Sequence, residues 1–145
     1  MSDPHQRHRP KWFLVLSILA LIWNMLGLMA FISHVMMTPE MIAELPEAQQ
    51  SLYQDTPIWA TLAFALAVFS GTSGCIFLVL KKAFANVLFV ASLIGILLQN
   101  YYTFFVIDSI SALGLSSLIM PLLVLTIAIA LILMTSKAEQ KQWLQ

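Results

Sequence analysis

The chain has 145 residues, of which 60% are hydrophobic and only 10% are charged, and its formal net charge is zero. A soluble domain carries roughly 25% charged residues, and a chain of this size has too little interior to bury so much apolar surface. The composition therefore excludes an ordinary soluble domain. We expect the lipid bilayer to be the main partner of the chain, and we expect no nucleic-acid partner.

Four tracts contain no Asp, Glu, Lys or Arg, namely residues 12–39, 56–80, 83–107 and 109–136. A helix needs ~20 apolar residues to cross ~30 Å of hydrocarbon, and backbone polar groups in lipid must be paired within the protein. The sequence therefore predicts an all-α polytopic membrane protein. We expect a four-transmembrane-helix bundle with a short amphipathic outer segment between the first two helices.

The predicted transmembrane helices are residues 12–37, 57–80, 83–107 and 115–136. The other segments are a basic tail at 1–11, an acidic amphipathic loop at 38–56, a turn at 81–82, a loop at 108–114 and a tail at 137–145. The basic start followed by apolar residues also resembles a signal peptide. The apolar run is longer than a signal peptide needs and lacks a small-residue cleavage site, so we interpret it as a retained first helix.

The seven Lys and Arg residues fall in only three segments. They are Arg7, Arg9 and Lys11 in the first tail, Lys81 and Lys82 in the turn, and Lys137 and Lys141 in the last tail. The loops at 38–56 and 108–114 carry only acidic charges. Because Lys and Arg in short loops remain on the cytoplasmic side, we expect both the N-terminus and the C-terminus in the cytoplasm.

Two Thr-Pro pairs mark expected helix starts. Thr38-Pro39 places a capping residue before a proline at the first helical position, and Thr56-Pro57 repeats the pattern before the second transmembrane helix. Between the pairs, an apolar stripe opposes a polar face, which predicts one or two short helices on the outer membrane surface. Pro121 lies inside the predicted fourth helix and predicts a kink there.

Small residues gather on one face of the second transmembrane helix. Two series follow a small-xxx-small spacing that lets another helix approach closely: Ala63, Ala67 and Gly71, and Ser70 and Gly74. If the chain forms a homo-oligomer, we expect this face to make the contact between copies.

Uncharged polar side chains lie within the apolar tracts. Asn24 is near the middle of the first helix, and Gln99, Asn100 and Tyr102 lie on the third. Because an unpaired polar group in hydrocarbon costs several kcal/mol, these side chains should face the bundle interior. They either fix helix packing through hydrogen bonds or bind a neutral hydroxylated solute, since amides and tyrosine supply donors and acceptors.

His34 and Asp108 are expected at the outer rim of the bundle. If they meet, the pair would sense pH or accept a proton; the alternative is a solvated surface contact. No tract contains the buried charge that proton-coupled transporters need, and no cluster of nucleophile, base or metal ligands stands out. We therefore expect no catalytic residues, no metal site, no cofactor and no enzymatic activity.

A series of motifs runs through the first three helices and their links. They are Trp23-Asn24-x-x-Gly27, Thr38-Pro39-Glu40, Leu45-Pro46-Glu47, Thr56-Pro57-x-Trp59-Ala60, Phe69-x-Gly71-x-x-Gly74-Cys75 and Lys81-Lys82. Together they resemble a group of small four-helix bacterial inner-membrane proteins, many of which carry the label "sugar transporter". The resemblance covers about Trp12 to Tyr102, implies a bacterial inner-membrane location and solute transport, and supplies no site residues.

Two functions follow as expectations. The first is a transport-related role for a neutral, sugar-like solute, carried out by a homo-oligomer because four helices are few for a transporter. The alternative is a non-transporting accessory or assembly subunit of a larger membrane complex.

Overall fold

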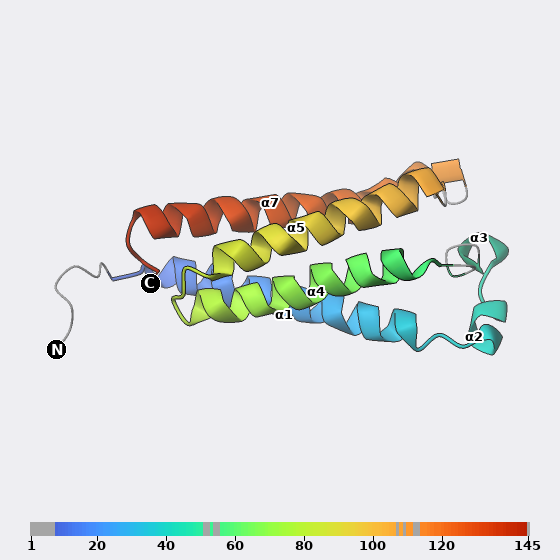
Figure 1. The fold of residues 1–145 in the computed structure, drawn as a ribbon, viewed down its shortest axis with the longest axis horizontal. Coiled ribbons are helices and arrows are strands. Elements are labelled where there is room, and N and C mark those ends of the chain that lie inside the picture. Colours follow the sequence, from blue (N-terminus) through green and yellow to red (C-terminus); the bar gives the residue numbers. More distant parts are fainter. Residues whose placement is uncertain are drawn as a thin grey trace.

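The computed structural model describes residues 8–50, 53, 56–106, 108, 110–111 and 114–144. Its four long helices are α1 (Lys11–Val35), α4 (Ile58–Val79), α5 (Ala85–Tyr101) and α7 (Ile119–Gln140), which run side by side (Figure 1). Two short helices, α2 (Pro39–Ala43) and α3 (Glu47–Gln50), join α1 to α4. A π-helical segment, η1 (Tyr102–Val106), extends α5, and a 3-10 segment, η2 (Leu115–Leu118), precedes α7.

The described part of the chain confirms the predicted membrane architecture. Four helical spans are long and apolar enough to cross a membrane: Lys11–Val35, Ile58–Val79, Ala85–Val106 and Leu115–Gln140. Large apolar side chains are exposed on the outer face of every long helix, as expected for surfaces that contact lipid. The chain is thus an all-helical, multi-pass membrane protein built as a four-helix bundle.

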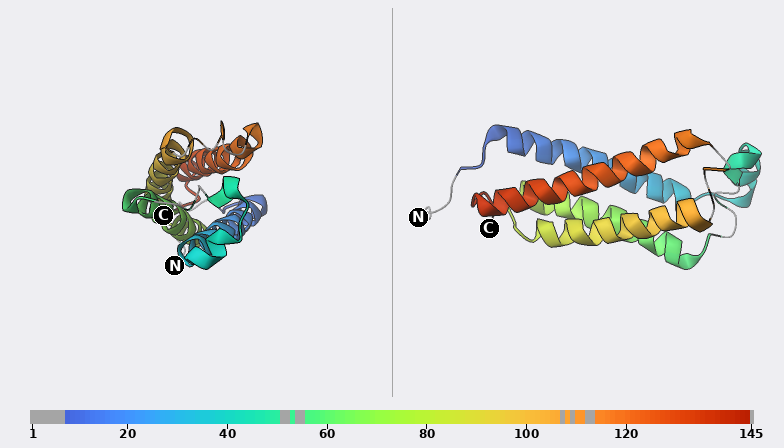
Figure 2. Two further views of the ribbon diagram at one scale, coloured as in Figure 1. Left: turned by 90° about the vertical axis from the view of Figure 1, so that its right-hand side faces the viewer. Right: turned by 90° about the horizontal axis from the view of Figure 1, so that it is seen from above.

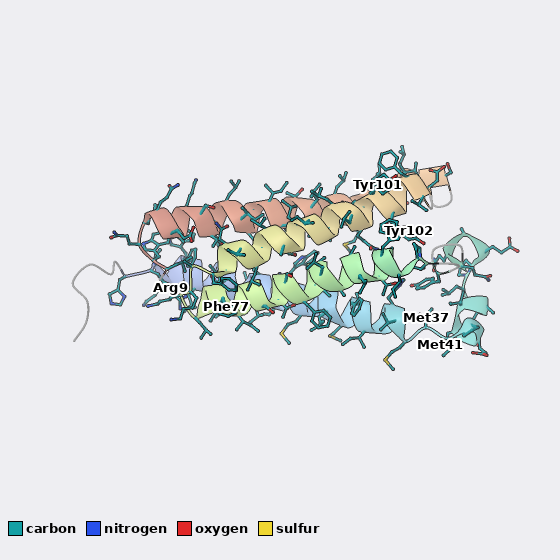
Figure 3. All side chains as sticks on the ribbon, in the orientation of Figure 1. Arg9, Met37, Met41, Phe77, Tyr101 and Tyr102 are labelled. Atoms are coloured by element: carbon teal, nitrogen blue, oxygen red, sulfur yellow. The ribbon has the colours of Figure 1, made fainter. Side chains whose placement is uncertain are left out.

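The long helices form a ring in the order α1, α4, α5, α7 (Figure 2). Close packing joins α1 to α4, α4 to α5 and α5 to α7, whereas α1 and α7 are not a closely packed pair among the described residues. Arg9, the turn between α4 and α5, and the end of α7 lie at one end of the bundle, here called the terminal end (Figures 1 and 3). Helices α2 and α3 lie at the opposite end, here called the far end.

The tightest approach within the bundle lies between α4 and α5 at Gly95. A Cβ atom added there would lie 2.7 Å from Ala63 O and 2.7 Å from Ala67 N, both of which are backbone atoms. Nearby, the Ser92 hydroxyl donates a 2.7 Å hydrogen bond to Ala67 O. The absence of a side chain at Gly95 therefore sets the distance between these two helices.

The small-residue face of α4 packs inside the chain. A Cβ atom added at Gly74 would lie 2.8 Å from the Phe89 ring on α5, and one added at Gly71 would press on the Asn24 side chain of α1. The prediction that this face joins two copies of the chain is wrong, because α1 and α5 of the same chain already cover it. The close helix approach itself is confirmed.

One of the two predicted Thr-Pro caps is present. Thr38 caps α2, where its hydroxyl oxygen accepts a 3.3 Å hydrogen bond from the Met41 N–H, and Pro39 follows at the first helical position. The predicted Thr56 cap is wrong, because α4 begins one residue later than the pattern requires. Pro57 occupies the cap position, and the Thr56 hydroxyl instead donates to Tyr53 O at 3.5 Å.

The position of Pro121 also differs from the prediction. Since α7 begins at Ile119, Pro121 lies in its first turn rather than in its interior. The N–H groups of a first turn have no partner within the helix, so a proline there removes no hydrogen bond. The helix geometry changes just before this proline, where the 3-10 segment η2 gives way to α7.

At the terminal end, α4 closes with a left-handed residue. Lys81 has φ 62°, and the Lys82 N–H donates a 2.8 Å hydrogen bond to Phe77 O, which is the geometry of a Schellman cap. The Arg9 guanidinium donates to Leu78 O at 3.2 Å and to Val79 O at 2.9 Å. A cation near the C-terminus of a helix is favoured by the helix dipole, so the N-terminal tail stabilises this turn.

Helix α7 ends in the same way and turns its tail back onto α1. Gln142 has φ 60°, and the Trp143 N–H donates to Ala138 O at 2.9 Å. The Trp143 ring then packs on Phe13, with 5.3 Å between ring centroids. The terminal plug, as we call it, consists of the buried side chains Phe13, Cys75, Leu78, Ala138 and Leu144.

Candidate ligand-binding cavity

A cavity of about 480 Å³ lies inside the ring of helices. Its lining comes from all four long helices and from η1. The volume falls within the range of about 300–1,000 Å³ that is usual for small-molecule sites. Phe89 and Leu131 belong both to this lining and to the buried cluster that contains the terminal plug, so the plug lies beyond one end of the cavity.

The wall of the cavity formed by α5 and η1 is polar. It presents the side chains of Gln99, Asn100 and Thr103, which we call the polar wall. Within the described ranges, none of these three side chains makes a hydrogen bond, and Gln99 Oε1 is buried without a partner. Most buried polar groups in proteins are paired, so the unpaired Gln99 Oε1, beside the partly exposed Asn100 and Thr103, indicates a place for hydrogen bonds from a bound molecule.

The π-helical geometry of η1 contributes to this wall. The Tyr102 N–H reaches the carbonyl oxygens of both Gln99 and Leu98, where the regular helix ends. Thr103 lies in the π-helical turn and still faces the cavity with Gln99.

Deeper in the cavity, Asn24 combines a packing contact with an open acceptor. Its Nδ2 donates to Ala20 O at 2.9 Å and to Cys75 Sγ at 3.3 Å, which fixes the orientation of the amide. No hydrogen bond to Asn24 Oδ1 is found in the part of the chain that the structure describes. The Asn24 side chain fits here because Gly71 has no side chain.

The structure separates the residues predicted to bind a solute. Asn24, Gln99 and Asn100 line the cavity, whereas Tyr102 does not. Tyr102 is buried between α4 and α5, and its ring meets the Trp59 ring edge-on with 5.4 Å between centroids. Tyr101 and Tyr102 both lie near the far end (Figure 3), where their rings pack rather than line the cavity.

His34 and Asp108 each have other partners. The His34 ring lies 5.1 Å from the Tyr53 ring and 5.8 Å from the Phe64 ring, measured between centroids. The Asp108 carboxylate accepts a 2.7 Å hydrogen bond from the Ser111 hydroxyl. The described residues therefore show His34 in an aromatic cluster at the far end and Asp108 in a loop turn.

The wall formed by α7, next to the polar wall, is entirely apolar. Its residues are Met120, Pro121, Val124, Ile127, Ala128 and Leu131. Thr126, the polar residue near the middle of α7, is exposed and donates to Leu122 O within its own helix at 2.8 Å. Sequence reasoning missed this apolar wall, because a helix that is apolar on all sides gives no sign of which face points inward.

The cavity is free of charge. None of its lining residues is acidic, basic or a histidine, and no group of three or more His, Cys, Asp or Glu in the described ranges could hold a metal ion. Such a lining can donate and accept hydrogen bonds but offers no counter-charge for an ion.

The chain was compared with protein-family models, curated proteins and solved structures, and it matches none of them.

Proposed function

We propose that this chain is a small integral protein of a bacterial inner membrane that binds a neutral, hydroxyl-bearing solute, sugar-like in this respect, as a step in its transport. The observation that carries the proposal is the polar wall of Gln99, Asn100 and Thr103 in a cavity free of charge, where Gln99 Oε1 is buried without a partner. Leaving a buried polar group unpaired costs about 1–3 kcal/mol. The hydroxyl groups of a bound solute would remove this cost, whereas an ion would find no counter-charge.

The closure at one end of the bundle supports a transport role. The terminal plug separates the cavity from the terminal end, while lining residues such as Thr103 and Met120 reach towards the far end. A cavity closed on one side corresponds to one of the states that an alternating-access transporter adopts. Since one chain supplies only four long helices, transport would involve a homo-oligomer.

The same chain offers a surface for a second candidate role, that of an accessory subunit in a larger membrane complex. The buried residues of α1 are Phe13, Ser17 and Ala20, and all three lie in the N-terminal half of the helix. The rest of α1 therefore exposes apolar side chains that would contact either lipid or a neighbouring subunit. Crosslinking in native membranes would distinguish the roles, since an accessory subunit would be recovered with a different protein.

The orientation that we propose places the terminal end in the cytoplasm. The described Lys and Arg residues gather at that end: Arg9, Lys11, Lys81, Lys82, Lys137 and Lys141. Glu40, Glu44 and Glu47 belong to the segment around α2 and α3 at the far end. This distribution agrees with the retention of positive charge on the cytoplasmic side.

Labelling of introduced cysteines with a membrane-impermeant thiol reagent tests this orientation. In intact bacterial cells, Glu40→Cys is expected to react, whereas Lys82→Cys is expected to react only after the inner membrane is permeabilised. The native Cys75 is fully buried and should stay unlabelled in both variants. Labelling of Lys82→Cys in intact cells would contradict the proposed orientation.

Uptake into proteoliposomes tests the binding of a neutral solute. With radiolabelled glucose, xylose and mannitol as probes, we expect uptake of at least one, and we expect Gln99→Leu to reduce it about tenfold through the loss of a hydrogen bond. Thr126→Val is the matched control, because Thr126 is an exposed polar residue outside the cavity. Uptake of none of the probes, or uptake unaffected by Gln99→Leu, would contradict the proposed function.

A further inference from the structure

The two long walls of the cavity differ in chemistry. The polar wall offers amide and hydroxyl groups from Gln99, Asn100 and Thr103, while the lining residues of the neighbouring helix α7 are all apolar. Hydroxyl groups of a bound solute would find partners on the polar wall but none on α7. A molecule with one polar end and an apolar body would match both walls.

The side of the cavity between α1 and α7 is the one that close helix packing does not cover. These two helices are the neighbours in the ring that do not pack closely among the described residues (Figure 2). Three residues line the cavity and are also exposed: Leu26 and Ala30 on α1, and Met120 on α7. Leu26 is 57% exposed and Met120 is 60% exposed, so they form the rim of this side.

This rim lies at the depth of the bilayer. Ala30 is inside the membrane span Lys11–Val35, and Met120 is inside the span Leu115–Gln140. A helix rises about 1.5 Å per residue, so Ala30 lies roughly 7–8 Å from the end of α1. This side of the cavity therefore faces the lipid, while the terminal plug blocks the passage towards the terminal end.

We infer that the cavity binds an uncharged amphiphile, with a hydroxyl- or carbonyl-bearing headgroup and an apolar chain, which enters from the bilayer between α1 and α7. The headgroup bonds to Gln99, Asn100 and Thr103, and the chain packs on Val124, Ile127 and Leu131. A phosphate or ammonium headgroup is excluded by the absence of charged lining residues. This inference rests on the proposed function, which requires a neutral ligand, and specifies its class and its route of entry.

Photocrosslinking in lipid nanodiscs tests the inference. The probe is a monoacylglycerol that carries a diazirine in its acyl chain, and the adducts are mapped by mass spectrometry. We expect adducts on the inward-facing residues of α7, from Val124 to Leu131. We expect 1-decanoylglycerol to displace the probe, whereas glycerol, which lacks the chain, and decyl phosphate, which carries charge, should not.

A bulky residue at the rim tests the route of entry. Ala30→Trp is expected to reduce the labelling inside the cavity about tenfold by blocking access to the site. The matched control is Ala130→Trp, which adds the same side chain to an exposed position of α7 outside the cavity and should leave labelling unchanged. Equal melting temperatures of the two variants would show that the loss does not come from unfolding.

Two results would overturn the inference: adducts confined to the outward faces of the helices, or cavity labelling that Ala30→Trp leaves unchanged. The proposed function would survive either result if glucose, xylose or mannitol uptake remained sensitive to Gln99→Leu. If that uptake were also absent, both proposals would fail.

Discussion

Replacing Gly95 by alanine is expected to lower the free energy of unfolding by about 3 kcal/mol, at the upper end of the usual cost of overpacking an interior. The added Cβ atom would lie 2.7 Å from Ala63 O and Ala67 N. Because these are backbone atoms, no side-chain rotation can relieve the contact, and α4 and α5 must move apart. That movement also lengthens the hydrogen bond from the Ser92 hydroxyl to Ala67 O.

Gly27→Ala is the matched control for this prediction. Its added Cβ atom would lie 3.7 Å from Val68 Cγ1, which is an ordinary van der Waals contact. Alanine also has a higher helix propensity than glycine, by up to about 1 kcal/mol. We expect this variant to be as stable as the parent chain or more stable. Unfolding by SDS in mixed micelles measures both variants, and equal stability of the two would contradict the packing described for α4 and α5.

Removing the Phe13 side chain is expected to give the second large effect. Phe13 is fully buried in the terminal plug, against Trp143. Truncation of a buried phenylalanine to alanine costs about 3–5 kcal/mol in the general case. We expect about 3 kcal/mol for Phe13→Ala, because lipid reduces the hydrophobic part of this cost while the lost packing remains.

The same substitution is expected to open the terminal end of the bundle. Cys75 belongs to the terminal plug and is fully buried, so its reaction with a small thiol reagent should become faster in Phe13→Ala. Val15→Ala is the control, because Val15 is 55% exposed. This substitution should change the free energy of unfolding by no more than about 0.5 kcal/mol. If Cys75 is equally unreactive in both variants, the plug does not close this end.

The membrane architecture could be predicted from the sequence because it depends on composition along the chain. Each tract without charge contains one of the long helices, and the apolar length of a tract decides whether it can span a bilayer. The short helices also followed from local chemistry, since Thr38 and Pro39 act within one turn of α2. Thr56 failed as a cap because a shift of one residue in the start of α4 moves its hydroxyl out of reach.

The cavity could be predicted only in part, because it depends on how each helix is rotated. The inward orientation of Asn24, Gln99 and Asn100 can be predicted because polar groups avoid lipid. No such signal exists for Val124 or Ile127, whose neighbours around α7 are equally apolar. The small-residue face of α4 predicts close helix packing. The sequence contains nothing that distinguishes a partner helix in the same chain from one in another copy.

An experimental structure tests the proposed ligand cavity most directly. For this structure, the protein is transferred from its membrane into nanodiscs together with its bound lipid. The account predicts density from a non-protein molecule inside the cavity, within hydrogen-bond distance, about 2.7–3.2 Å, of the Gln99 and Asn100 side chains. A structure in which the helices close the cavity, and in which Gln99 and Asn100 are paired with other protein groups or turned towards lipid, would contradict it.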